Sequence, residues 1–302
     1  MTSSGKLVYK MHESRGDKVF NSFNVLFTLV CVAVCIYPLY FIIIASFSDP
    51  SLVTLGKVTI FPKGITFEGY EKILVDAELW TGYKNTIMYA TFGTILNLVL
   101  TLTAGFALSR KELPFRRVIM SIFTITMFIN GGLVPTFLLM KELGLYNTFW
   151  IMILLNGISV YNLIICRTFF QSTIPNELWD AAQIDGCNEF RFFFSVVLPL
   201  SGALIAVLAL YYAVGHWNTY FNAMIYLRNK KLFNLQLVLR NILLTNQYTD
   251  DMASLDVGAD TSMKLQTMKY AIIVVSTVPM LIVYPFVQKH FVKGVMIGSV
   301  KG

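Results

Sequence analysis

The polar stretch ELWDAAQIDG, residues 177–186, decides how this 302-residue chain is interpreted, and it runs on to VVLP at residues 196–199. It lies between two long apolar segments. Pro175 suits the first turn of a helix, where its missing N–H costs no hydrogen bond, and Glu177 favours the same turn through the helix dipole. Gly186 then permits a sharp reversal of the backbone. We predict two short helices broken at Gly186, forming a polar hairpin that offers a docking surface to a soluble partner.

The sequence around this hairpin is that of a membrane protein. Hydrophobic residues make up 56% of the chain and charged residues only 14%, whereas about a quarter of a soluble domain is charged. Six stretches contain no Asp, Glu, Lys or Arg, and each reaches the roughly 17–25 residues that cross a hydrocarbon core. These stretches are 19–48, 85–109, 118–140, 143–166, 192–227 and 270–288. We therefore predict an all-α membrane protein with six transmembrane helices, the first of which is retained rather than cleaved as a signal peptide.

Charge asymmetry predicts the orientation of the chain. Bases are dense in both tails and in the loop 110–117, and short basic loops stay in the cytoplasm. The net charge of +7 follows from this topology and does not indicate nucleic-acid binding. The predicted parts are a cytoplasmic N-terminal tail 1–18, a membrane domain 19–288 with an inner hairpin 174–191 and outer loops 49–84 and 228–269, and a cytoplasmic C-terminal tail 289–302.

The third predicted span carries a helix-breaking signal. It contains NGGLVP from Asn130 to Pro135, and glycine and proline leave backbone groups unpaired inside a membrane helix. This predicts a hinge, or a bend that lines a cavity. Close packing of helices at small residues is the alternative interpretation.

Both long outer loops are predicted to contain a surface helix. Residues 68–80 have the composition of a short helix that ends in the interfacial aromatic belt. Between residues 232 and 243, leucine and isoleucine recur at helical spacing with polar residues between them. That spacing predicts an amphipathic helix on the outer face.

Several functional classes are disfavoured by what the sequence lacks. It has no Gly-x-x-x-x-Gly-Lys-Ser/Thr phosphate loop, no apparent Ser/His/Asp set, and three histidines that do not cluster. No ionisable Asp, Glu, Lys or Arg lies inside a predicted span, which argues against an ion-coupled carrier. We expect no enzyme activity, no metal site and no disulfide among the four cysteines, Cys31, Cys35, Cys166 and Cys187. We therefore expect a partner protein to supply the energy for the conformational changes of this chain.

The hairpin resembles the Glu-Ala-Ala loop of ABC importer permeases, which reads Glu-Ala-Ala, three residues, Gly, nine residues, Ile-x-Leu-Pro. The matching positions are DAA at 180–182, Gly186 and VVLP at 196–199, with Asp in place of Glu and Val in place of Ile. Nearly the whole chain is similar to the maltose-type carbohydrate permeases, in particular the MalG-like half and the LplC/YtcP-type permeases of oligosaccharide importers. NGGLVPT at 130–136 and the tail 288–302 also carry the likeness. The resemblance implies a type I ABC importer permease fold.

The resemblance also implies partners. They are a second related permease, two ATP-binding subunits that hold ATP and Mg inside, and an extracytoplasmic solute-binding protein that delivers sugar. In that family the first helix of the hairpin sits in a cleft of the ATPase, and the C-terminal tail contacts the ATPase as well. The implied location is the bacterial cell membrane, and no cofactor is expected in this chain. The implied ATPase-coupling residues are Glu177, Asp180, Ala181, Ala182, Asp185 and Gly186.

A substrate path is predicted from side-chain chemistry. Sugars bind by stacking on aromatic rings and by hydrogen bonds from amides and hydroxyls, and residues 215–222, GHWNTYFN, offer these groups. The alternative is structural, because Trp and Tyr also mark the membrane interface and Asn bonds neighbouring helices. In the maltose-type family the sugar lies mainly in the other permease. The candidate path residues are Trp217, Asn218, Tyr220, Asn222, Asn130 and Asn156.

The expected function is passage of an oligosaccharide through an importer powered by partner ATPases. One alternative is an ABC permease for a uronate- or glycosaminoglycan-derived sugar or another polar solute. An ATP-independent carrier or channel is a second alternative, and a membrane scaffold without a transport role is a third. The sequence does not name the sugar, because selectivity in such systems is set largely by the solute-binding protein.

Overall fold

The computed structural model describes residues 14–253 and 268–282, and every regular element in these two ranges is a helix. In chain order the elements are α1 (Arg15–Ser46), α2 (Pro50–Thr54), α3 (Glu68–Val75), α4 (Ala77–Ser109), α5 (Arg116–Phe128), α6 (Leu133–Glu142), α7 (Ile151–Leu154), α8 (Val160–Thr173), α9 (Asn176–Ile184), α10 (Glu189–Phe192), the π-helix η1 (Phe193–Val197), α11 (Leu198–Leu200), α12 (Gly202–Trp217), α13 (Phe221–Tyr226), the 3₁₀ helix η2 (Lys230–Leu232), α14 (Leu235–Ala253) and an apolar helix Met268–Ile282.

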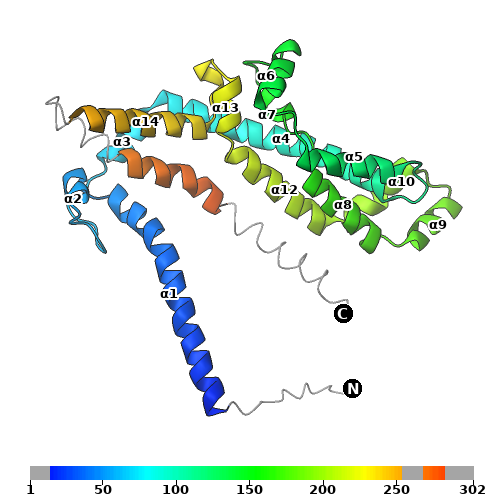
Figure 1. Cartoon of the computed structure of the whole chain (residues 1–302), viewed down its shortest axis with the longest axis horizontal. Helices are drawn as coiled ribbons and strands as arrows, with labels where there is room; N and C mark the ends of the chain where they lie inside the picture. The colour runs from blue at the N-terminus through cyan, green and yellow to red at the C-terminus, as the bar shows by residue number, and fades with distance from the viewer. Residues whose placement is uncertain (1–13, 254–267, 283–302) are drawn as a thin grey trace.

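Helix α4 is the central element of the molecule, because α8, α12 and α14 all pack along it (Figure 1). Asp76 caps its N-terminus by accepting hydrogen bonds from the N–H groups of Glu78 and Leu79. At three glycines of α4 the absence of a side chain lets a neighbouring segment pack directly against the helix backbone. A Cβ atom built on Gly82, Gly93 or Gly105 would lie 3.2, 2.4 or 2.5 Å from the nearest atom of Leu235, His216 or Cys166 respectively.

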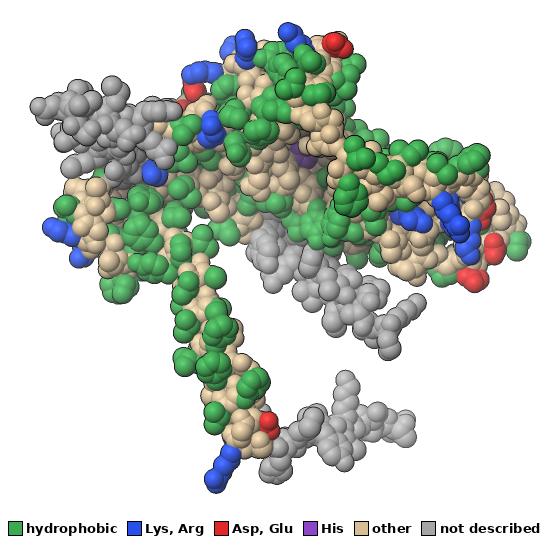
Figure 2. All heavy atoms as spheres, viewed as in Figure 1, with side chains coloured by type: hydrophobic (Ala, Val, Ile, Leu, Met, Phe, Trp, Pro, Cys, Tyr) green, Lys and Arg blue, Asp and Glu red, His purple; other side chains and the backbone are tan. Residues whose placement is uncertain are grey.

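Helix α1 stands away from this body (Figure 1). Ser14 and Asp17 form a capping box at its start, so two backbone N–H groups that lack helical partners are satisfied. Residues 15–40 are exposed, and Figure 2 shows hydrophobic side chains around the rod. Its contacts with other segments lie in the C-terminal part, where the Tyr37 and Tyr40 hydroxyls donate to the carbonyl oxygens of Thr59 and Ile60. The ring of Phe41 lies edge-on to Tyr270 there, with centroids 6.1 Å apart.

Two pairs of apolar helices are sharply bent. Helices α5 and α6 meet at 115°, and the helical run Glu189–Leu200 meets α12 at 82°. At the first bend Gly132 has a φ of +86°, which favours glycine because a Cβ atom is disfavoured there. No atom lies within 4 Å of the position that its Cβ would occupy, so this glycine serves the bend and not a close helix contact. The predicted bend that lines a cavity in residues 118–140 is confirmed, and its action as a hinge stays a prediction.

The prediction of six transmembrane helices is not confirmed. Among the described residues only α1 and α4 are long and apolar enough to cross a membrane alone, and each bent pair adds one more if it counts as a single span. The stretch 143–166 is divided between α7 and α8, since Ser159 caps a new helix start by accepting a hydrogen bond from the Asn162 N–H. Residues 283–288 of the sixth predicted span lie outside the described residues. The length of a stretch without charged residues does not show whether a new helix begins inside it. The six-span topology therefore remains a prediction.

Both predicted outer-loop helices are present. Residues 68–80 form α3 and, after the cap at Asp76, the first turn of α4. The predicted amphipathic helix is α14, which buries Leu235, Val238 and Leu239. It packs against α4, and its position is fixed there in part by the Leu235 N–H, which donates to the Thr86 hydroxyl at 2.8 Å.

Candidate functional site

The hairpin at 174–191 forms as two helices joined by a tight turn. Helix α9 follows the extended residue Pro175, and Glu177 lies in its first turn. Gly186 has a φ of +71°, a conformation that side chains with a Cβ rarely adopt. Asn188 then caps α10, since its side chain accepts a hydrogen bond from the Arg191 N–H at 2.8 Å. The predicted break at Gly186 is confirmed.

An aromatic cluster holds the hairpin to the rest of the chain. Trp179 on α9 is only 8% exposed, and its ring lies edge-on to Phe192 with centroids 5.0 Å apart. The guanidinium carbon of Arg110, from the loop after α4, lies 4.5 Å from the centroid of the Trp179 ring. Arg110 Nε also lies 3.6 Å from the Glu112 carboxylate. The stacked cation and ring therefore join the basic loop 110–117 directly to the hairpin.

The outward surface of the hairpin combines carboxylates with exposed apolar groups. Five of the six predicted coupling residues are exposed, and Ala182 is half-buried against the aromatic cluster. Ile184 is 88% exposed and Phe190 is 79% exposed. Figure 2 shows acidic side chains gathered at the end of the molecule where Figure 1 places α9. The exposed coupling residues are Glu177, Asp180, Ala181, Asp185 and Gly186.

The six predicted path residues divide between two cavities. Trp217, Asn218 and Tyr220 line a cavity of about 680 Å³ between α14 and the helix Met268–Ile282, the α14 cavity. The other three line a cavity of about 540 Å³ at the bend between α5 and α6, the hinge cavity. These three are Asn130, Asn156 and Asn222. The structure therefore does not bring the six side chains together in one place.

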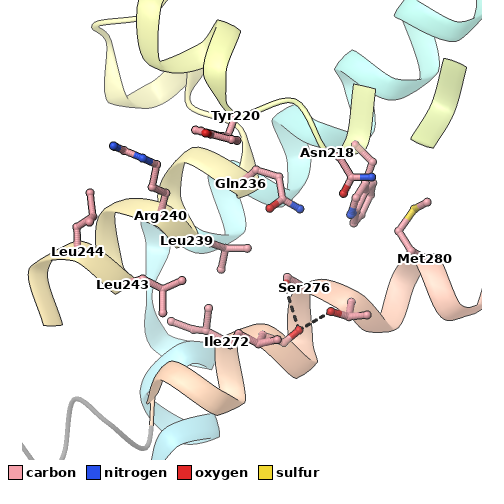
Figure 3. Close-up of a pocket in the computed structure, with 13 residues that line it drawn as sticks. Asn218, Tyr220, Gln236, Leu239, Arg240, Leu243, Leu244, Ile272, Ser276 and Met280 are labelled. Carbon is pink, nitrogen blue, oxygen red and sulfur yellow. Dashed lines mark hydrogen bonds between the residues drawn. The ribbon is translucent and has the colours of Figure 1, made fainter. Parts of the chain in front are cut away.

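The α14 cavity is mostly apolar with amides on one side (Figure 3). Gln236 and Asn218 point into the gap, whereas Arg240 points away from it beside the Tyr220 ring, whose centroid lies 6.0 Å from the guanidinium carbon. Trp217 is only 7% exposed and packs in a hydrophobic core cluster. This packing holds the Trp217 ring in place at the wall of the cavity, and its contact with a sugar stays a prediction.

A third cavity contains residues that the sequence analysis did not select. It measures about 420 Å³ and lies between α4, α8 and α12. We call it the polar cavity, because amide, hydroxyl and imidazole groups dominate its wall. Its lining residues are Asn97, Asn156, Ile158, Ser159, Asn162, Tyr211, Tyr212, Gly215, His216 and Thr219.

One side-chain amide organises this cavity. Asn97 is fully buried, and its Nδ2 donates to the carbonyl oxygens of Asn156 and Gly157, each at 2.8 Å. Because Nδ2 is occupied by two acceptors, Oδ1 faces His216, whose Nε2 lies 2.6 Å away and must carry the proton. The network ties the break between α7 and α8 to α4 and α12. The signal in the sequence was a polar Asn in the middle of a charge-free stretch.

A second pair of hydroxyls closes the same wall. The Tyr212 hydroxyl lies 2.6 Å from the Thr101 hydroxyl and accepts a hydrogen bond from the Ser159 N–H at 3.2 Å. Tyr212 therefore satisfies a backbone group at the start of α8, where a helix has N–H groups without helical partners. The polar cavity is held open by side chains from α4 and α12 on both sides of this break.

Comparisons with known proteins agree over almost the whole chain. A family model described as binding-protein-dependent transport system inner membrane component matches residues 5–297. The polygalacturonan/rhamnogalacturonan transport system permease protein YtcP of Bacillus subtilis (strain 168) is 37% identical over 287 residues, 95% of this chain and 99% of that protein. Protein LplC of the same organism is 37% identical over 295 residues, 98% of this chain and 99% of that protein.

A solved structure is similar as well. It is the crystal structure of a bacterial ABC transporter involved in the import of the acidic polysaccharide alginate. One of its chains aligns with a TM-score of 0.84 and 32% identity, and the alignment covers 93% of this chain and 99% of that one.

Proposed function

The chain belongs to the family of binding-protein-dependent transport system inner membrane components, as a non-catalytic permease subunit of an ABC importer for sugars or oligosaccharides, and from that premise we propose that the α9–α10 hairpin is the surface through which a partner ATPase moves it. In this proposal the assembly contains a second permease and two ATP-binding subunits, which hold ATP and Mg. An extracytoplasmic solute-binding protein delivers the sugar. Both termini and the hairpin lie on the cytoplasmic side.

The observation that carries this proposal is the contrast between the two faces of α9. One face is fixed by Trp179 against Phe192 and Arg110, while the opposite face leaves Ile184 almost fully exposed beside Asp180. An exposed apolar group with carboxylates around it fits an apolar cleft that has bases at its rim. A soluble ATPase with such a cleft is the partner that the proposal requires.

The same contacts give the hairpin a way to transmit force. The Arg110–Trp179 stack connects α9 to the end of α4, and the run α10–η1–α11 connects it to α12 through the 82° bend. A displacement of α9 therefore acts on α4 and on α12, which pack against each other more extensively than any other pair of the described elements. We propose that ATP binding moves the hairpins with the ATPases and switches the permease between inward-open and outward-open states, a rigid-body change biased from a distant site.

The proposed cargo is an oligosaccharide. The proteins similar to this chain include a polygalacturonan/rhamnogalacturonan permease and an importer of the acidic polysaccharide alginate, which favours a uronate-containing sugar as the second candidate. Asn130, Asn156 and Asn222 in the hinge cavity, and Asn218 and Tyr220 in the α14 cavity, remain proposed contacts of the path. Trp217, which lines the α14 cavity and packs in a core cluster, remains a proposed contact as well.

A single substitution on the exposed face of α9 tests the docking role. Ala181→Glu adds bulk and charge at an exposed position, so folding is expected to be unaffected while ATPase docking is blocked. The measurement is saccharide uptake and ATP hydrolysis by the full complex in proteoliposomes, and uptake is expected to fall at least tenfold. Ala77→Glu makes the same change at an exposed site in the first turn of α4, where a carboxylate suits the helix dipole, and it should transport normally. Parental uptake by the Ala181→Glu complex refutes the proposal.

A further inference from the structure

We propose that the polar cavity between α4, α8 and α12 binds the uncharged hydroxyl face of a sugar unit during transport, with Asn162 as its principal ligand. This inference rests on the proposed transport function and names a site that the predicted path residues did not include, apart from Asn156. The cavity volume of about 420 Å³ falls within the roughly 300–1,000 Å³ that is usual for small-molecule sites.

Asn162 is the observation that points to a ligand. The residue is 5% exposed and lines the cavity, yet its side-chain amide makes no hydrogen bond with any residue in 14–253 or 268–282. The fully buried side-chain atoms without a partner in the described residues belong to Thr94 and Arg110, so the Asn162 amide is not sealed in the protein but is accessible from the cavity. Only the backbone N–H of Asn162 is engaged, by the Ser159 hydroxyl at 3.5 Å. The amide therefore keeps two donor hydrogens and an acceptor oxygen for whatever enters the cavity.

His216 on α12 supplies a second free acceptor in the lining of the same cavity. Its Nε2–H donates to Asn97 Oδ1, so the uncharged imidazole leaves Nδ1 as an acceptor, and Nδ1 has no partner among the residues that the structure describes. Asn156 is exposed and also lines the cavity. Its side-chain amide is available to a ligand, because the hydrogen bond to Asn97 uses only its backbone carbonyl. Amides and an imidazole in one lining match sugar hydroxyls, which donate and accept at once.

The charge of the wall selects the part of a sugar that binds. None of the lining residues is an acid, a lysine or an arginine. A carboxylate that enters the cavity therefore finds no cation to pair with, whereas hydroxyl groups find amides and hydroxyls. The cavity therefore takes ring hydroxyls, and a uronate substrate would keep its carboxylate outside it. Asn97 lies near the middle of α4, which agrees with the midplane position of substrate sites in transporters.

The test uses the full importer in proteoliposomes with its solute-binding protein, and arabinotriose, raffinose and a galacturonic acid trimer as probes. For each probe that the parent moves, Asn162→Leu is expected to raise the ATP hydrolysed per sugar at least tenfold, because the ATPases still turn over while the sugar is not held. A purely structural defect would lower hydrolysis and uptake together. Thr103→Val is the matched control, since Thr103 is exposed on α4 and its hydroxyl bonds only its own helix. The control should remain within twofold of the parent.

A second variant keeps the inference testable if Asn162→Leu does not assemble. Asn156→Ala removes an exposed side chain that makes no hydrogen bond, so it should assemble normally, and it is expected to raise the same ratio at least threefold. Ratios within twofold of the parent for every assembled variant overturn the inference while leaving the proposed function intact. A parent complex that moves none of the probes contradicts the proposed function and, with it, this inference.

Discussion

Replacing Gly93 by alanine is expected to force α12 away from α4. The new Cβ would lie 2.4 Å from His216 Nε2 and 2.5 Å from its Cε1. Since non-bonded atoms are in favourable contact at about 3.5–4.0 Å, the imidazole must move by roughly 1 Å. Nε2 is now 2.6 Å from Asn97 Oδ1. A movement of roughly 1 Å away from Asn97 lengthens this distance to about 3.6 Å, beyond the roughly 3.2 Å limit of a good hydrogen bond. One methyl group therefore strains the helix contact and breaks the bond that organises the polar cavity.

The net cost follows from three effects. Overpacking a well-filled contact costs about 1–3 kcal/mol. The lost hydrogen bond adds about 1 kcal/mol. Alanine offsets about 1 kcal/mol of this, because it is a better helix former than glycine. The free energy of unfolding is thus expected to fall by about 1–3 kcal/mol.

The assay is thermal unfolding of the purified complex in detergent, followed by tryptophan fluorescence. At about 2–4 °C per kcal/mol, the midpoint for Gly93→Ala should fall by several degrees. Gly215→Ala is the matched control, because Gly215 also lies in a helix interior and has no atom within 4 Å of its Cβ position. In a His216→Ala background the clash partner is absent, so Gly93→Ala should cost almost nothing. The reasoning is wrong if Gly93→Ala unfolds no earlier than Gly215→Ala.

Three further outcomes are expected. Trp179→Ala empties a buried site at a cost of about 3–5 kcal/mol to local hairpin stability, which should appear as faster proteolytic cleavage of the hairpin and loss of transport. Arg110→Lys keeps the charge but loses the planar stack on Trp179, so cleavage should increase by a smaller amount, equivalent to about 0.5–2 kcal/mol. Hydrogen bonds from the Ser51 hydroxyl and N–H lower the pKa of Asp49. The ionised carboxylate therefore stabilises the fold above its unfolded-state pKa of about 4, and this stabilisation is lost as pH falls through the lower folded-state pKa. Asp49→Asn should melt below the parent at pH ~7 and together with it at pH ~2, and a gap that persists in acid contradicts the reasoning.

The elements that the sequence predicted correctly depend on local signals. Gly186 and Gly132 both have positive φ, and each was identified as a break because glycine tolerates that conformation. The amphipathic helix α14 was visible in its leucine spacing, and it buries the face that the spacing indicated. Such signals lie within one or two turns of the chain, so a single sequence reveals them.

The sites in the interior depend on packing between distant segments. His216 and Asn97 are separated by 119 positions and meet because Gly93 lets α12 approach α4. Asn162 has no sequence feature that distinguishes it from an ordinary polar residue at a helix start. Trp217 shows the same dependence on packing, since its aromatic chemistry indicates a sugar contact while the structure places it in a hydrophobic core cluster at the wall of the α14 cavity. Residue type predicts what a side chain is able to bind, and only packing determines whether the side chain is free to do so.

The isolation of α1 has a consequence for how much sequence change that segment tolerates. Residues 15–40 are exposed, whereas Ala45 and Ser46 are buried at the end that joins the body. Interchange of Val, Ile, Leu and Phe along residues 15–36 leaves the affinity of the helix for hydrocarbon almost unaltered, so within this chain that part is constrained by hydrophobicity rather than by shape. A constraint on its shape would come from the proposed second permease. The last turn packs in a filled site, because Ala45 and Ser46 are buried there. Adding a single methylene to either side chain is expected to destabilise the fold.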